Sequence, residues 1–204
     1  MNAFNFLRNA FAGRKLATAG FVWLCLIVVA AIVAPLIAPF DPLEIDPVGR
    51  LAEPGWPNLF GTDHFGRDTF SRAIYGARMT VIIGFGSVIV ALFCGGLIGM
   101  LSAYFTRLGH FLMRGIDVLM AFPALLMALV LITLLERSVF NTVLVIGIVY
   151  ATTTARILFG MTLKLKGEVF IDAAVCSGAG HSSILFRHIL PNLLSPLLLS
   201  LIHI

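Results

Sequence analysis

The sequence predicts an all-α protein built as a polytopic transmembrane helix bundle. Of its 204 residues 59% are apolar and only 12% are charged, whereas a soluble domain carries roughly 25% charged residues. The mean hydropathy of +1.01 points the same way. A helix needs about 20 mostly apolar residues to cross the bilayer core. Four stretches without Asp, Glu, Lys or Arg reach that length or can be extended to it: 16–40, 79–106, 118–135 and 138–155.

These stretches predict four complete spans and the start of a fifth. The expected segments, in chain order, are a cytoplasmic tail at 1–15, span one at 16–40, an extracytoplasmic segment at 41–78, span two at 79–106, span three at 112–135, span four at 138–160, a cytoplasmic loop at 161–192 and an incomplete span five at 193–204. The last run is interrupted by two prolines and is too short to cross a membrane. We therefore expect a C-terminally truncated chain.

Proline and capping signals predict where the first elements begin and end. Pro35 and Pro39 mark the outer end of span one. In the extracytoplasmic segment, Asp68 is a suitable N-cap for a short interfacial helix over 69–75, and Gly76 is a suitable stop. A structural plug over the spans is favoured as the role of this segment, and direct contact with a substrate is the alternative.

The inner spans carry three further signals. Gly95 and Gly99 have the G-x-x-x-G spacing that allows close helix approach, and packing within the bundle is favoured over a dimer seam. Pro123 predicts a kink in span three. Asp117 is ionisable near the end of a span, and a local pair with Arg114 is favoured over a role in an ion pathway.

Lysine and arginine counts predict the orientation, because these residues concentrate in cytoplasmic loops. With the N-terminus inside, nine lie in the cytoplasm: Arg8, Arg14, Lys15, Arg107, Arg114, Arg156, Lys164, Lys166 and Arg187. Five lie outside: Arg50, Arg67, Arg72, Arg78 and Arg137. The net charge of +4 thus follows from topology, and we expect no nucleic acid partner.

Other side chains offer no chemistry of their own. The five histidines lack metal-ligand spacing, and the chain has no G-x-x-x-x-G-K-[ST] phosphate loop. The three cysteines are divided between membrane depth and cytoplasm, so no disulfide is expected. We predict no catalytic residues, no metal site and no cofactor.

The cytoplasmic loop predicts two short helices. The first covers 168–177 and ends at Gly178 in the left-handed conformation. The second begins at a cap provided by His181 or Ser182 and is broken by Pro191. Small residues on the first helix predict a smooth face that another backbone can approach. A short helix of this kind is marginal in water and needs a partner surface.

This loop resembles the EAA loop, E-A-A-x3-G-x9-I-x-L-P, of inner-membrane subunits of bacterial ABC importers. Asp172 replaces the Glu of the motif and His188 replaces the Ile. The resemblance implies a coupling helix that docks on an ATPase subunit. The residues it assigns to docking are Asp172, Ala173, Ala174, Ser177, Gly178, Arg187, His188, Leu190 and Pro191.

The extracytoplasmic segment contains a second motif, LFGTDHFGRDTFSRAIYGAR at 59–78. It resembles the signature of C-type permeases of dipeptide, oligopeptide and nickel importers. The matching positions include Gly61, Thr62, Asp63, Gly66, Arg67, Asp68, Ser71, Arg72, Gly76 and Arg78.

Together the two motifs imply the type I ABC importer permease fold and a place in the bacterial inner membrane. The expected function is to form half of a peptide translocation pathway. The implied partners are a second, B-type permease subunit, two cytoplasmic ATP-binding subunits, an extracytoplasmic substrate-binding protein and membrane lipid. Nickel or glutathione are alternative substrates. A membrane-embedded enzyme or channel is the competing class, but it would need paired polar residues at span centres, which the spans lack.

Overall fold

The computed structural model describes residues 15–200. These residues confirm the all-α prediction, because they form helices and connecting loops with one isolated bridge between Thr62 and Asp68. The predicted tail, except for Lys15, and the last four residues of the chain lie outside the described residues. The chain forms two compact units, Met1–Ile82 and Ile83–Ile204.

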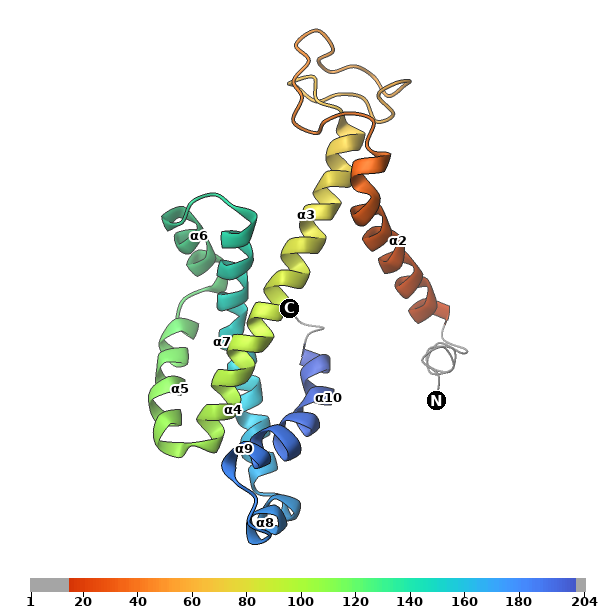
Figure 1. Cartoon of the computed structure of the whole chain (residues 1–204). Coiled ribbons are helices and arrows are strands. Elements are labelled where there is room, and N and C mark those ends of the chain that lie inside the picture. The colour runs from red at the N-terminus through yellow and green to blue at the C-terminus, as the bar shows by residue number, and fades with distance from the viewer. Residues whose placement is uncertain (1–14, 201–204) are drawn as a thin grey trace. The chain divides into compact units, whose positions relative to one another are not determined.

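The first unit contains α2 (Lys15–Ile37), a long loop and the beginning of α3 (Thr69–Val90) (Figure 1). Helix α2 contains Pro35 and ends two residues after it, near the predicted boundary. Asp68 caps α3 as predicted, since its Oδ2 accepts a hydrogen bond of 2.7 Å from the backbone N–H of Ser71.

The predicted short interfacial helix over 69–75 is wrong. Helix α3 begins at Thr69 as expected, but it continues through Gly76 to Val90. Gly76 does not adopt a positive φ. Glycine inside a helix costs only about 1 kcal/mol relative to alanine, and good helix formers follow it, so this glycine is too weak a signal to end the helix.

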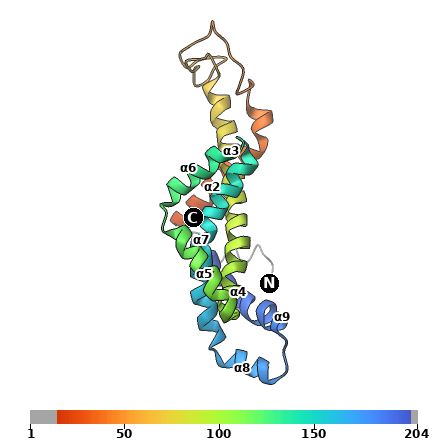
Figure 2. The same ribbon diagram turned by 90° about the vertical axis from the view of Figure 1, so that its left-hand side faces the viewer.

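In the second unit, α3 continues through the π-helical turn η1 (Ala91–Gly95) into α4 (Gly96–Tyr104). Helix α7 (Val139–Lys166) packs along η1 and α4, and both views show it beside α4 (Figures 1 and 2). A Cβ on Gly99 would come within 2.4 Å of the backbone oxygen of Ala155 in α7. The G-x-x-x-G spacing therefore serves packing within this chain, as favoured from the sequence.

Helices α5 (Thr106–Met120) and α6 (Ala124–Leu134) meet at a sharp bend at Pro123. The angle between them is 92°, so the predicted kink in span three is present and large. Among the described residues three helices are long and apolar enough to cross a membrane: Lys15–Ile37, Thr69–Tyr104 and Val139–Lys166. The bent pair makes a fourth if it is counted as one span.

The predicted local pair between Arg114 and Asp117 is wrong. The carboxylate of Asp117 instead forms an ion pair with Arg156 of α7. Residues three apart on a helix are neighbours, but the packing of α5 against α7 brings a second cation to the same carboxylate. Sequence spacing alone does not reveal that packing.

The C-terminal part of this unit consists of α8 (Val169–Cys176), α9 (His181–Ser183), η2 (Ile184–Ile189) and α10 (Leu190–Ser200). The prediction that Pro191 breaks the second helix is wrong. Pro191 is the second residue of α10 and lacks a backbone N–H. The wide turn of η2 immediately precedes it, and the Leu190 N–H bonds to the oxygen of Leu185, five residues back. The backbone passes through the proline without interruption.

One hydrophobic core joins the long helices to this C-terminal part. It contains Met100 of α4, Leu158 of α7 and Ile171 of α8. Five further buried side chains come from η2 and α10: Ile184, Leu185, Ile189, Leu193 and Leu197. Helix α8 is therefore packed, through one residue, into the same core as α4 and α7.

Candidate functional site

The first candidate site is the 161–192 segment, whose centre is α8. Glu168 adopts an extended conformation before the helix, and Asp172 lies in the first turn, where a carboxylate is favoured by the helix dipole. Both views place α8 at one end of the second unit, beyond the ends of α4 and α7. The segment thus forms a projection supported by the two long helices.

Gly178 ends α8 in the left-handed conformation that the sequence predicted, with φ of +81°. The Gly178 N–H bonds to the oxygen of Val175 at 2.9 Å, and the Ala179 N–H bonds to the oxygen of Ala174 at 3.0 Å. These two bonds form a Schellman motif, which satisfies carbonyls at the helix end. The Ser177 hydroxyl donates to the Ala173 oxygen at 2.8 Å, so the turn is closely hydrogen-bonded.

The exposed face of α8 is larger and more apolar than predicted. Asp172, Ala173 and Ser177 are exposed. However, the side chains of Val169, Phe170 and Val175 are also exposed, by 81%, 41% and 55%. Ile171 alone among these apolar side chains turns inward and is 3% exposed. The prediction of a face without large side chains is wrong, because one short helix buries only the side that meets the core.

The second half of the segment begins at Gly180, which takes the cap position instead of His181 or Ser182. Along η2 and the start of α10, Arg187 and Pro191 are exposed, while His188 and Leu190 are half-buried. Ile184, Leu185 and Ile189 lie between them in the core. The predicted docking residues therefore lie in two places: on α8 and the turn that ends it, and on η2 with the start of α10. Those on α8 are the more exposed.

The second candidate site is the 41–78 segment, in which Asp63 forms ion pairs with Arg67 and Arg72. Asp63 Oδ2 lies 2.8 Å from Arg67 Nη2 and 3.4 Å from Arg72 Nη1. Asp63 Oδ1 accepts backbone hydrogen bonds from Phe65 at 2.8 Å and Arg67 at 3.0 Å. Burial by itself would raise the pKa of Asp63, but the hydrogen bond from the Arg67 side chain, the two backbone hydrogen bonds and the Arg67 charge outweigh it and lower the pKa from 3.8 to about 2.

Asp68 connects this loop to α3. Its Oδ1 accepts a hydrogen bond of 3.0 Å from Asn58 Nδ2, while its Oδ2 caps α3. Burial opposes ionisation of this carboxyl, but the hydrogen bonds from Ser71 and Asn58 lower its pKa. The Ser71 hydroxyl in turn accepts a hydrogen bond from the Phe40 N–H at 3.2 Å. The loop is thereby attached to the end of α3.

Other residues of the 59–78 motif shape the backbone. Gly61 and Gly66 both have positive φ, of 69° and 77°. A Cβ on Gly66 would overlap the backbone oxygen of Asp46. The Thr62 hydroxyl donates to the Gly49 oxygen and accepts from the Ala52 N–H. For Gly76 a Cβ would meet nothing within 4 Å, so nothing in this unit explains a glycine there.

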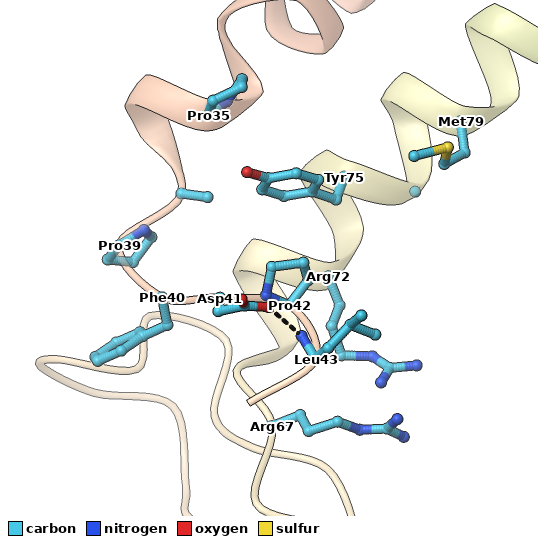
Figure 3. Close-up of a pocket in the computed structure, with 12 residues that line it drawn as sticks. Pro35, Pro39, Phe40, Asp41, Pro42, Leu43, Arg67, Arg72, Tyr75 and Met79 are labelled. Atoms are coloured by element: carbon cyan, nitrogen blue, oxygen red, sulfur yellow. Dashed lines mark hydrogen bonds between the residues drawn. The ribbon is translucent and has the colours of Figure 1, made fainter. Parts of the chain in front are cut away.

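A cavity of about 760 Å³ lies beside this loop, between the end of α2 and the start of α3 (Figure 3). Figure 3 shows Arg67 and Arg72 extending in the same direction from the wall that also carries Tyr75 and Met79. Pro35, Pro39, Pro42 and Leu43 also line the cavity. The motif residues Arg67, Arg72 and Gly76 thus meet at one surface, which the sequence did not predict.

Sequence reasoning also missed contacts between distant residues. The Tyr104 hydroxyl at the end of α4 lies 2.7 Å from His181 Nδ1 at the start of α9. The two residues are 77 positions apart, and no local pattern relates them. Within residues 15–200 no three His, Cys, Asp or Glu side chains are grouped as metal ligands.

Comparison with known proteins supports an assignment to a transport family. Residues 95–203, about half of the chain, match the family described as binding-protein-dependent transport system inner membrane component. Residues 6–54 match the N-terminal TM domain of oligopeptide transport permease C.

Several curated proteins are similar along most of this chain. The dipeptide transport system permease protein DppC of Alkalihalophilus pseudofirmus is 36% identical over 90% of this chain and 61% of its own length. A putative peptide transport system permease protein of Brucella suis biovar 1 is 38% identical, over 89% and 62%. The di/tripeptide transport system permease protein DppC of Pseudomonas aeruginosa is 35% identical, over 93% and 65%.

The chain spans about three fifths of the length of these relatives. All of them carry names of transport permeases and none of them carries the name of an enzyme. The apolar helices, the two motifs and the family match agree, and the chain belongs to the family of binding-protein-dependent transport system inner membrane components.

Proposed function

We propose that this chain is a permease subunit of an ATP-driven ABC importer that carries di- or oligopeptides across the bacterial inner membrane. In this proposal it forms half of the pathway together with a B-type permease subunit. Two cytoplasmic ATP-binding subunits supply the chemistry, and a substrate-binding protein delivers the peptide outside. The dipeptide and peptide permease names of the relatives support this substrate class.

The observation that carries the proposal is the dual character of α8. Its inner side is fixed by Ile171 in the core shared with α4 and α7, and its outer side exposes Val169, Phe170 and Val175. Exposed apolar patches mark interaction surfaces. A short helix packed into the bundle on one side can transmit the movement of a partner as a nearly rigid body. The proposed partner of this face is the ATP-binding subunit.

The orientation of the chain belongs to the same proposal. The nine-to-five distribution of lysine and arginine supports a cytoplasmic N-terminus, and the 161–192 segment would then lie in the cytoplasm, where ATP is. The 41–78 segment then faces the binding protein. Its two arginines and the cavity beside them lie in the segment exposed to that side.

The test places a charge on the exposed face of α8. Val169→Asp and Val175→Asp in the full-length subunit should insert at parental levels, because neither side chain is in the core. Each should sharply lower recovery of the ATP-binding subunits on purification of the complex, since a carboxylate would be buried unpaired in the interface.

The matched control is Val48→Asp. Val48 lies in the 41–78 segment and is 96% exposed, so its variant should recover the ATP-binding subunits fully. Full recovery with both α8 variants would exclude α8 as the docking helix.

A further inference from the structure

Three side chains from three elements meet at the base of the α8 projection. Tyr104 is the last residue of α4, Lys166 is the last residue of α7, and His181 is the first residue of α9. The Tyr104 hydroxyl is 2.7 Å from His181 Nδ1. The Lys166 ammonium donates a hydrogen bond of 2.9 Å to the Tyr104 backbone oxygen. One tyrosine therefore contacts both residues that border the projection.

Ring packing reinforces the hydrogen bond. The centroids of the Tyr104 and His181 rings are 5.5 Å apart with an interplanar angle of 76°. Phe105 contacts the same imidazole edge to face at 5.9 Å. Such edge-to-face arrangements stabilise aromatic pairs beyond the area they bury. His181 is thus held by a hydrogen bond and by two rings of the α4–α5 junction.

The lysine contact has a separate physical basis. The Tyr104 carbonyl is one of the last carbonyls of α4, which lack partners within the helix. A cation at a helix C-terminus is favoured by the helix dipole, and Lys166 Nζ also lies 5.6 Å from the centroid of the Tyr104 ring. This contact joins the end of α7 to the end of α4.

The two contacts close the projection into a loop with a fixed base. Residues 167–180 leave from Lys166 and return at His181, and both border residues are attached to Tyr104. The returning chain packs against the core at the half-buried Ala179, and it is buried there from Ile184 and Leu185 onward. The hydrogen bond therefore anchors the turn that follows Gly178 directly to α4.

We propose that Tyr104 and His181 are positioning residues that transmit displacement of α8 to α4. The inference rests on the proposed function, in which α8 receives the movement of an ATP-binding subunit. Chain continuity carries the displacement into α7, and the Tyr104–His181 contact carries it into α4. The two helices then move together.

The first experiment measures the contact itself and does not depend on the proposed function. Amide hydrogen exchange is followed in the full-length subunit, in lipid nanodiscs, over residues 177–183. A neutral hydrogen bond contributes about 1 kcal/mol, so Tyr104→Phe should speed exchange there roughly fivefold. Tyr75→Phe, which removes a hydroxyl in the other unit, should change nothing in this segment. Equal exchange in the parent and Tyr104→Phe would overturn the proposal.

The second experiment measures coupling in the assembled complex. Tyr104→Phe and His181→Phe keep an aromatic ring but remove the hydrogen bond. Both variants should recover the ATP-binding subunits at parental levels and transport several-fold less peptide per ATP hydrolysed. The reciprocal exchange, Tyr104→His combined with His181→Tyr, keeps one hydroxyl and one imidazole at the contact. It should restore the amount of peptide transported per ATP hydrolysed.

The outcomes separate the two proposals. Unchanged peptide transport per ATP in both single variants would overturn the positioning role, as would a loss that the reciprocal exchange does not restore. Failure of the proposed function would be seen instead as undiminished ATPase recovery by the Val169→Asp and Val175→Asp variants.

Discussion

Replacement of Gly178 tests how the end of α8 is built. The residue has φ of +81°, and a Cβ placed on it would meet nothing within 4 Å. The cost of Gly178→Ala is therefore conformational and not steric. An alanine in the left-handed region costs about 1–2 kcal/mol. A loss of about 1.4 kcal/mol in the free energy of local opening raises the population of the open state roughly tenfold.

The assay is amide exchange at Gly178 and Ala179, whose N–H groups make the two bonds of the Schellman motif. Gly178→Ala should speed exchange of both amides by about fivefold to tenfold or more, on the strain of about 1–2 kcal/mol. Gly180→Ala is the matched control, because Gly180 has φ of −73° and equally open surroundings. Equal protection in the two alanine variants would refute the reasoning.

A leucine at the same position separates strain from docking. Since the space around Gly178 is open within this chain, Gly178→Leu should be strained about as much as Gly178→Ala. If Gly178→Leu recovers fewer ATP-binding subunits than Gly178→Ala on purification of the complex, the difference reports contact between this turn and the partner. If leucine and alanine variants recovered the subunits equally, Gly178 would lie outside the docking surface.

Three further predictions concern other parts of the chain. In intact cells Cys176 should not react with an impermeant thiol reagent, whereas Thr62→Cys should react; the opposite pattern would reverse the proposed orientation. The lowered pKa of Asp63 means that its stabilising contribution is present above pH 3.8 and is lost as pH falls through about 2. The protection of residues 61–68 from amide exchange should fall as the pH drops from 3.8 to about 2. In Asp63→Asn this pH-dependent fall should be absent. Gly99→Ala should lower the thermal stability of the purified subunit, because its Cβ would come 2.4 Å from a backbone oxygen of α7. Gly84→Ala should leave the thermal stability unchanged, because a Cβ on Gly84 would meet nothing within 4 Å. Equal melting temperatures for the two alanine variants would contradict the packing argument.

The sequence by itself determined the features that depend on local backbone chemistry. Pro123 predicts the bend between α5 and α6 because it lacks a donor. Asp68 predicts the start of α3 because its carboxylate can accept a hydrogen bond from the first turn. Gly178 predicts the end of α8 because it tolerates a positive φ. Each signal acts within a few residues, so the sequence contains all of the information needed.

Only the tertiary structure decided which distant groups meet. Asp117 pairs with Arg156 because α5 packs on α7, and Tyr104 reaches His181 because the chain returns from α8 to the end of α4. The wide turn of η2 likewise lets the helix continue through Pro191, where a local rule predicts a break. These outcomes depend on the packing of helices that are far apart in the chain. Local helix propensities are worth about 1 kcal/mol or less per residue, or about 3 kcal/mol for proline, and packing overrides them.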